Sequence, residues 1–226
     1  MTEKFSRTQL LIGSENLQKL KNSTVMICGL GGVGGYVAEA IIRLGVGKII
    51  FVDSDKTDTS NLNRQILATE SSIGISKAIT AVERAKSINK DGEFISEIIF
   101  LNPDNIPSLL DKYKPDCVAD AIDNITAKLS LIVECQQRDI GIVSSMGTGN
   151  KTDPTKFKAD DIYNTSVCPL AKVMRNLLKK RGVKKLRVIY SDEQPTKCEN
   201  GIGTLSFVPA TAGLLIANEV YKHLLS

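Results

Sequence analysis

A glycine-rich turn is the first stretch of this chain whose residues could do chemistry. The apolar run Val25–Cys28 breaks into Gly29-Leu30-Gly31-Gly32-Val33-Gly34 and then continues with apolar residues at helical spacing. This order predicts a strand, a tight turn and a helix, in which Gly29, Gly31 and Gly34 let the backbone approach a phosphate and aim free N–H groups at it. The glycines alone fit NAD, FAD and ATP equally well.

An acid follows the next predicted strand. The run 48–53 ends in Asp53, which is placed to accept hydrogen bonds from ribose hydroxyls. The polar segment 54–65 comes next, where a dehydrogenase would normally continue into a crossover helix. Because open α/β sheets bind ligands beyond the carboxyl ends of their strands, these residues predict a nucleotide site there.

Two more charged residues belong to the same edge of the predicted sheet. Lys77 falls in the first turn of a predicted helix, where a cation opposes the helix dipole, so it either faces a phosphate or is a solvated lysine. Asp123 ends the predicted strand 117–124, where it either holds Mg²⁺ on a triphosphate or caps the next helix.

The histidine and cysteine content limits the catalytic and metal-binding arrangements that the chain can form. The single histidine, His223, falls near the end of the last predicted helix, so a Ser-His-Asp triad or a His-ligated metal is not expected. The five cysteines contain no C-x-x-C pair, which argues against structural zinc and against a disulfide framework. Catalysis must then use Arg, Lys, Asp, Asn, Cys or a bound metal.

The length and composition of the chain fit one large α/β domain over residues 1–226. We expect an N-terminal arm at 1–22, a nucleotide-binding half at 23–145, and a crossover loop with a C-terminal part at 146–226. Hydrophobic residues make up 42% and charged residues 24% of the chain, with no apolar run long enough to span a bilayer. The amino terminus lacks the apolar core of a signal peptide, so a cytoplasmic location is expected.

Apolar periodicity places the remaining elements. It predicts further strands at 94–101, 140–145, 188–190 and 204–208, a short helix at 14–20 in the arm, and a long loop from Met146 to Pro169. A final helix opens at Pro209 and carries Leu214, Ala217, Tyr221 and Leu224 on the face that covers either the sheet or a dimer partner.

Two features of the second half bear on function. The segment Arg175–Arg187 is the densest positive stretch and contains no acid, so it is either a solvated face or a contact for nucleic acid. Cys168 precedes Pro169 at a predicted helix start, a setting that makes a thiol more reactive, although a buried cysteine is the alternative.

Together, several motifs resemble the ubiquitin-activating-enzyme-like superfamily that includes the ThiF and MoeB adenylyltransferases. They are Gly29–Gly34, Asp53-Ser54-Asp55, Asn61-Leu62-Asn63-Arg64-Gln65, Lys77 and Asp123-Asn124. The stretches 144–151 and 165–175, and the two ends 5–8 and 206–209, look like the tRNA threonylcarbamoyladenosine dehydratase branch.

The resemblance implies a Rossmann-like E1/ThiF fold with a mostly parallel sheet, and an ATP-dependent reaction on tRNA. ATP would activate the threonyl carboxylate of the modified adenosine at position 37 as an acyl-adenylate, and the neighbouring carbamoyl group would close a ring and expel AMP. By motif position the implied residues are Gly31 and Gly34 at the phosphates, Asp53 at the ribose, Asn61, Arg64 and Lys77 at the triphosphate, Asp123 at Mg²⁺, and Gly29, Gly32, Asp55 and Gln65 in the same nucleotide site.

Partners are implied in the same way. Arg7 matches an arginine finger supplied by the second subunit of a homodimer, tRNA is the substrate, and a sulfur-relay partner protein is possible. Two alternatives stay open: an adenylyltransferase that activates the C-terminal glycine of a ubiquitin-like sulfur carrier, and an NAD-binding dehydrogenase or nucleotide sensor. The missing C-x-x-C pairs argue against the first, and the triphosphate-matched charges against the second.

Overall fold

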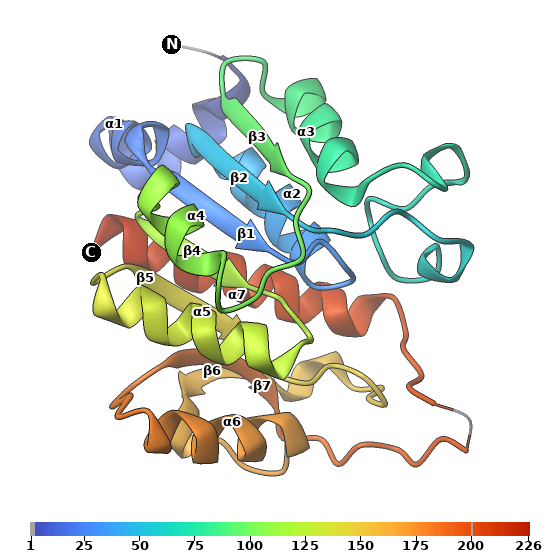
Figure 1. The fold of residues 1–226 in the computed structure, drawn as a ribbon. Coiled ribbons are helices and arrows are strands. Elements are labelled where there is room, and N and C mark those ends of the chain that lie inside the picture. Colours follow the sequence, from blue (N-terminus) through green and yellow to red (C-terminus); the bar gives the residue numbers. More distant parts are fainter. Residues whose placement is uncertain (1–2, 200) are drawn as a thin grey trace.

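Seven strands form one sheet in the computed structural model, which describes residues 3–199 and 201–226 (Figure 1). Their order is β3-β2-β1-β4-β5-β7-β6, and all neighbours are parallel except β6 with β7. The predicted mostly parallel α/β sheet is confirmed. The strands are β1 Thr24–Cys28, β2 Lys48–Val52, β3 Glu93–Glu97, β4 Cys117–Asp120, β5 Gly141–Ser145, β6 Phe157–Asp161 and β7 Arg187–Ser191.

Helices cover both faces of the sheet. The α-helices are α1 Ser6–Asn22, α2 Gly34–Leu44, α3 Lys77–Ile88, α4 Ile106–Tyr113, α5 Ile125–Gln137, α6 Pro169–Lys180 and α7 Phe207–Leu225. The 3-10 helices are η1 Glu3–Phe5, η2 Thr59–Asn61, η3 Glu70–Ser72, η4 Pro154–Lys156 and η5 Ile162–Asn164. Helices α2, α3 and α7 pack on one face, and α4, α5 and α6 on the other (Figure 1). Within the described residues, none of these helices has the length and apolarity needed to cross a bilayer.

The central strands are apolar on both sides because both sides are covered. In β1, Val25 and Ile27 join the core under α2 and α7, whereas Met26 and Cys28 join the core under α4 and α5. Such continuous apolar runs are typical of parallel strands buried between two helix layers. From β1 the chain continues to β2 on one side, while β4 pairs on the other side, so a crevice opens at their carboxyl ends.

Two strand predictions were wrong. The segment 204–208 is no strand: Asn63 donates to the carbonyl of Thr204, and the chain enters α7 at Phe207, two residues before the predicted start. The edge strand β6 lies inside the predicted long loop. Its charged residues hid it from a search for apolar alternation, yet charge is common on exposed sheet edges.

Several boundaries also differ from the predictions. Strand β3 ends at Glu97 rather than at residue 101, and β4 ends at Asp120 rather than at residue 124. The arm is helical from Ser6, with a break at Gly13, whose φ of 83° ordinary side chains avoid. Helix α7 covers the sheet, and of its four predicted face residues Ala217, Tyr221 and Leu224 pack on the core, whereas Leu214 faces outward at 52% exposure.

Candidate functional site

The glycine turn fits tightly against the chain around it. Gly29 has a φ of +85°, and a Cβ on it would lie 2.7 Å from the carbonyl oxygen of Ala121. A Cβ on Gly34, the first residue of α2, would lie 1.7 Å from the carbonyl oxygen of Gly29. Only glycine allows this close approach, which holds the turn between α2 and the loop that follows β4.

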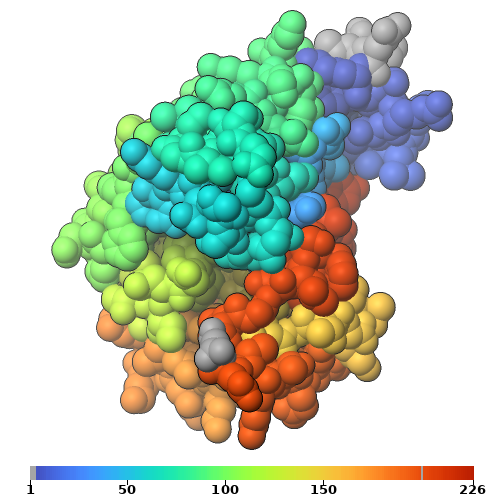
Figure 2. Space-filling model, turned by 90° about the vertical axis from the view of Figure 1, so that its right-hand side faces the viewer, coloured from blue at the N-terminus to red at the C-terminus, as the bar shows by residue number. Residues whose placement is uncertain are grey.

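A cavity of about 390 Å³ opens at the carboxyl ends of the central strands, and we call it the central cavity. Figure 2 shows this face of the molecule, framed by the teal segment around residues 55–75 and the orange-red segment that leads into α7. The structure brings ten of the predicted residues to its wall: Gly29, Gly31, Gly32, Asp53, Asp55, Asn61, Arg64, Gln65, Lys77 and Asp123. Their roles with a nucleotide stay predictions.

The carboxylate of Asp53 accepts a hydrogen bond from the glycine turn. Its Oδ2 accepts the N–H of Leu30 at 2.6 Å and its Oδ1 accepts the N–H of Asp55 at 2.8 Å. Burial raises the pKa of this carboxyl, and the two backbone hydrogen bonds counteract that effect only in part. The acid after β2 therefore fixes the glycine turn as well as lining the cavity.

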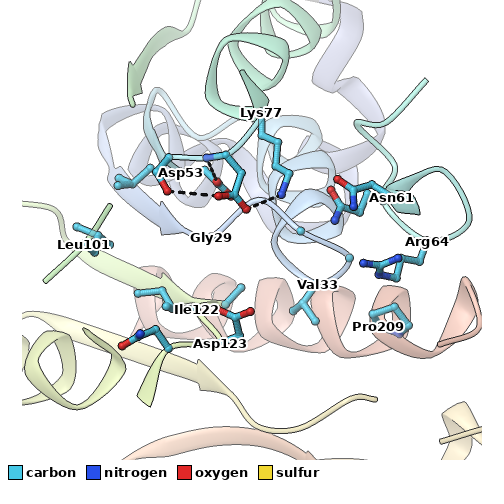
Figure 3. A pocket seen from close by; sticks show the side chains of 18 of the residues that line it. Gly29, Val33, Asp53, Asn61, Arg64, Lys77, Leu101, Ile122, Asp123 and Pro209 are labelled. Atoms are coloured by element: carbon cyan, nitrogen blue, oxygen red, sulfur yellow. Dashed lines mark hydrogen bonds and ion pairs between the residues drawn. The ribbon is translucent and has the colours of Figure 1, made fainter. Parts of the chain in front are cut away.

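Positive groups gather on one side of the central cavity (Figure 3). The side chain of Lys77 is only 7% exposed, and its Nζ lies 2.9 Å from the exposed carboxylate of Asp55. Arg64 is held by the carbonyl of Ser60 at 2.7 Å and has no ion pair within the described part of the chain. An anion with several charges fits this side, because a buried ammonium and an unpaired guanidinium both favour it.

Asp123 faces these cations from the opposite wall (Figure 3). The helix cap that it could have supplied comes from Asn124, whose Oδ1 accepts the N–H of Ala127 at 3.0 Å. The Asp123 carboxylate has no hydrogen bond or ion pair to any described residue and is exposed. An uncommitted carboxylate beside a cationic cavity fits a hard cation such as Mg²⁺.

The apolar end of the central cavity was missed from the sequence. Ile99, Phe100 and Leu101 follow β3 and line the cavity together with Ile122, and Thr148, Thr204 and Pro209 reach it from the second half. Residues 98–101 were predicted as strand, but they leave the sheet after Glu97. Their place just after a parallel strand was the signal that could have found them.

A buried ion pair beneath the site was also missed. Lys128 and Asp120 are completely buried, and the Lys128 Nζ lies 2.8 Å from Asp120 Oδ2, 3.2 Å from Ser144 Oγ and 3.0 Å from the carbonyl of Ser145. Asp120 Oδ1 accepts the N–H of Ile122 at 3.1 Å. This network joins the loop that carries Asp123 to the end of β5.

Arg7 and Gly34 are the two predicted residues that do not line the central cavity. Arg7 is exposed on α1, which lies at the edge where the strands begin, opposite the cavity (Figure 1). It cannot act on the cavity of its own chain in this arrangement. Action on a second subunit stays a prediction.

The cations of the basic segment Arg175–Arg187 fall into two groups, those that contact another part of the chain and those that do not form an ion pair with a described residue. Arg175 donates to Thr165, and Arg187 pairs with Glu219 at 2.7 Å. Five cations between them are exposed and have no ion pair within residues 3–199 and 201–226: Lys179, Lys180, Arg181, Lys184 and Lys185.

The cysteines show no common site. Cys28, Cys117, Cys135 and Cys168 are buried and Cys198 is exposed, which favours the buried interpretation of Cys168. Desolvation raises the pKa of Cys117 to about 12. The described residues bring no three His, Cys, Asp or Glu side chains together as a metal site.

The chain belongs to the ThiF family, whose model matches residues 5–226. It is 41% identical to the tRNA threonylcarbamoyladenosine dehydratase of Bacillus subtilis over 244 residues, which cover 100% of this chain and 96% of that protein. The Escherichia coli protein of the same name is 30% identical over 99% of this chain and 94% of its own length.

Solved structures agree with these sequence relatives. The crystal structure of the E. coli tRNA N6-threonylcarbamoyladenosine dehydratase TcdA in complex with ATP superposes with a TM-score of 0.93 at 31% identity, covering 98% of this chain and 93% of that one. The TcdA structure in complex with AMP gives the same score and coverage. The predicted E1-like fold is confirmed.

Proposed function

We propose that this protein is an ATP-dependent tRNA threonylcarbamoyladenosine dehydratase. The observation that carries the proposal is the central cavity, where Arg64 and Lys77 face the uncommitted carboxylate of Asp123 beside a glycine turn. The full-length similarity to dehydratases from two bacteria supports the same activity. The sulfur-carrier adenylyltransferase is not favoured, because the full-length relatives at 30–41% identity are dehydratases.

Each side of the central cavity suits a different part of ATP. The apolar wall at Ile99, Leu101 and Ile122 offers a surface for the adenine, and the cationic wall attracts the phosphates. Asp53 lies next to the turn, where a ribose would sit. Asp123 would hold Mg²⁺, which would supply positive charge to the phosphate oxygens.

The reaction then has two steps. A carboxylate oxygen of the threonyl group attacks the α-phosphorus, the bond to the β-phosphate breaks, and pyrophosphate leaves. The carbamoyl group next attacks the activated carbonyl carbon, the ring closes, a proton is lost and AMP leaves. Lys77 and Arg64 stabilise charge that develops on the phosphates, while the intramolecular ring closure depends mainly on positioning.

Substrate docking and assembly belong to the same proposal. The five exposed cations of the basic segment offer a contact for the tRNA phosphates. A homodimer would bring the partner's Arg7 to the cavity, and a cytoplasmic location suits a tRNA-modifying enzyme. A sulfur-relay partner protein and the division into arm, nucleotide-binding half and C-terminal part stay predictions.

The decisive test is to incubate the purified protein with ATP, Mg²⁺ and tRNA that carries threonylcarbamoyladenosine, and to analyse the nucleosides by mass spectrometry. We expect a product lighter by one water, with AMP and pyrophosphate released in equal amounts. Unchanged tRNA, together with pyrophosphate exchange stimulated by a sulfur-carrier protein, would support the adenylyltransferase instead.

A further inference from the structure

A second cavity of about 430 Å³ lies beside the central cavity, and we call it the side cavity. Its walls come from the start of the crossover loop, the start of α6 and the segment before α7. The two cavities share five lining residues: Val33, Ala121, Ile122, Asp123 and Thr148. A molecule in the side cavity therefore borders directly on one in the central cavity.

Most of the side cavity wall is apolar or small. It includes Met146, Gly147, Pro169, Leu170 and Ile202, and a Cβ on Gly147 would meet only Cys168 Sγ at 3.5 Å and Leu170 Cβ at 3.8 Å. One lining residue is acidic, Asp123 on the shared wall, and one is cationic, Lys151.

Lys151 is buried, and its ammonium makes no direct ion pair with a described carboxylate. The residue is 3% exposed, and its Nζ donates to the carbonyl oxygen of Glu193 at 2.6 Å. The Glu193 carboxylate accepts instead from the N–H groups of Thr152 at 2.8 Å and Asp153 at 3.0 Å. No described carboxylate lies within ion-pair distance of the Lys151 ammonium. A buried cation with donors to spare favours an anionic ligand.

Helix α6 adds positive potential at the same place. It begins at the cavity wall with Cys168, Pro169 and Leu170, and no side chain caps its first turn. That turn contains no acid. The free N–H groups and the dipole of a 12-residue helix thus also favour negative charge at this wall.

We propose that the side cavity receives the N6-substituent of the modified adenosine, and that Lys151 and the start of α6 recognise its carboxylate. The inference rests on the proposed function, and it assigns the part of the substrate that the cavity selects. The apolar walls accept the short carbon chain of the substituent, and the wall shared with the central cavity lets the carboxylate reach the α-phosphate of ATP.

The test compares two anticodon stem-loop RNAs in the absence of nucleotide. One carries threonylcarbamoyladenosine and the other carries its methyl ester, which lacks the carboxylate charge. We expect the wild-type protein to bind the acid about tenfold more tightly than the ester, and Lys151→Met to lose this preference. Lys156→Met is the matched control, because Lys156 is exposed in the same loop and should keep the preference.

Two results would overturn the assignment, provided that the wild-type protein still dehydrates modified tRNA. In the first, the wild-type protein binds the acid and the ester equally well. In the second, Lys151→Met still prefers the acid. If the wild-type protein neither dehydrates that tRNA nor distinguishes it from unmodified tRNA, the proposed function itself fails.

A second variant tests the cavity without removing a charge. Gly147→Val adds a side chain to the wall, where its Cβ would meet Cys168 Sγ and Leu170 Cβ at ordinary contact distances, and Gly147 does not line the central cavity. We expect it to raise the KM for modified tRNA at least about fivefold and to leave ATP binding unchanged. An unchanged KM in a folded Gly147→Val variant would contradict the assignment.

Discussion

The burial of Lys77 indicates the charge of the ligand that the central cavity would bind. Its side chain is 7% exposed, yet its carboxylate partner Asp55 is 65% exposed and can turn away. Keeping an ammonium buried costs free energy unless anionic charge compensates it. A phosphate chain beside Lys77, with a cation held by Asp123, would provide that charge.

We expect Lys77→Ala and Asp123→Ala each to lower ATP turnover about 100-fold or more, because each removes a charge from the part of the cavity where we propose that the phosphates bind. Both variants should fold, because alanine is a strong helix former at the start of α3 and Asp123 is exposed. Pyrophosphate release and circular dichroism measure both properties. Lys56→Ala, an exposed lysine outside the cavity, is the control, and normal turnover in either site variant would contradict the assignment.

Lys128 acts at the same scale through stability. Its ammonium pairs with Asp120 and both side chains are completely buried, so Lys128→Met should lower the free energy of unfolding by about 3–5 kcal/mol. Urea denaturation measures the loss. Adding Asp120→Asn removes the stranded charge, so the double variant should lose less than the sum of the two single losses. Additive losses would show that the two side chains are not coupled.

At the scale of elements, Glu39 joins helices α2 and α3. From α2 it accepts the Nε of Arg84 in α3 at 2.6 Å and the Nε of Arg43 at 2.7 Å. Burial opposes its ionisation, but the arginine hydrogen bonds outweigh that effect and lower the pKa of Glu39 below its usual 4.5. The contact contributes stability above pH 4.5 and loses it as pH falls through the lowered pKa.

Glu39→Gln should therefore destabilise the protein by about 0.5–1 kcal/mol at pH 7, and the difference from wild type should shrink as the pH falls below 4.5. Urea unfolding curves across this pH range measure it. Glu83→Gln, at an exposed residue of α3 that has no ion pair with any described residue, should show no such pH dependence. A constant difference at all pH values would contradict the linkage.

Helix α6 connects the side cavity to the basic segment. Its 12 residues span about 18 Å, and the exposed cations Lys184 and Lys185 follow its far end, where we expect RNA that inserts a base into the site to continue. We expect Lys184→Ala with Lys185→Ala to weaken tRNA binding and to reduce its salt slope by about 2, with ATP binding unchanged. Binding titrations at several salt concentrations measure this. Lys86→Ala with Lys90→Ala is the control, and equal losses in both pairs would argue against a local contact.

At the scale of the whole molecule, the position of Arg7 requires a partner if it is to act at a cavity. It is exposed at the edge of the sheet opposite its own cavity. Exposed apolar residues accompany it on α1, where Leu10 is 82% and Leu11 is 87% exposed. Such residues on the arm suit contact with a second chain.

Subunit mixing tests this arrangement. Arg7→Ala and Lys77→Ala should each be inactive alone, and co-refolded in equal amounts they should regain about one quarter of the wild-type activity, because half of the dimers then contain one intact site. Refolded single variants are the controls. Activity that stays at the average of the two single variants would show that Arg7 does not act across subunits.

Most of the local elements between residues 23 and 145 could be predicted from the sequence. Glycines that only a tight turn tolerates, apolar runs of strand length and the acids after them depend on steric and hydrophobic constraints within a few residues. The apolar wall at Phe100 and Leu101 could not be predicted, because those residues resemble a continued strand until the end of the sheet is known. Strand β6 was missed because an edge strand needs little apolar pattern, so its charged sequence did not resemble a strand.

By itself the sequence determined that a glycine-rich turn, an acid after β2 and a cation at the start of α3 lie at one sheet edge, because parallel strands place their carboxyl ends together. Only the tertiary structure decided which charges are free to meet a ligand. In the structure Asn124 caps the helix and Asp123 has no partner among the described residues, and Lys151 is buried without a direct ion pair beside a second cavity. Burial and hydrogen-bond partners come from segments far apart in the chain, so no local pattern encodes them.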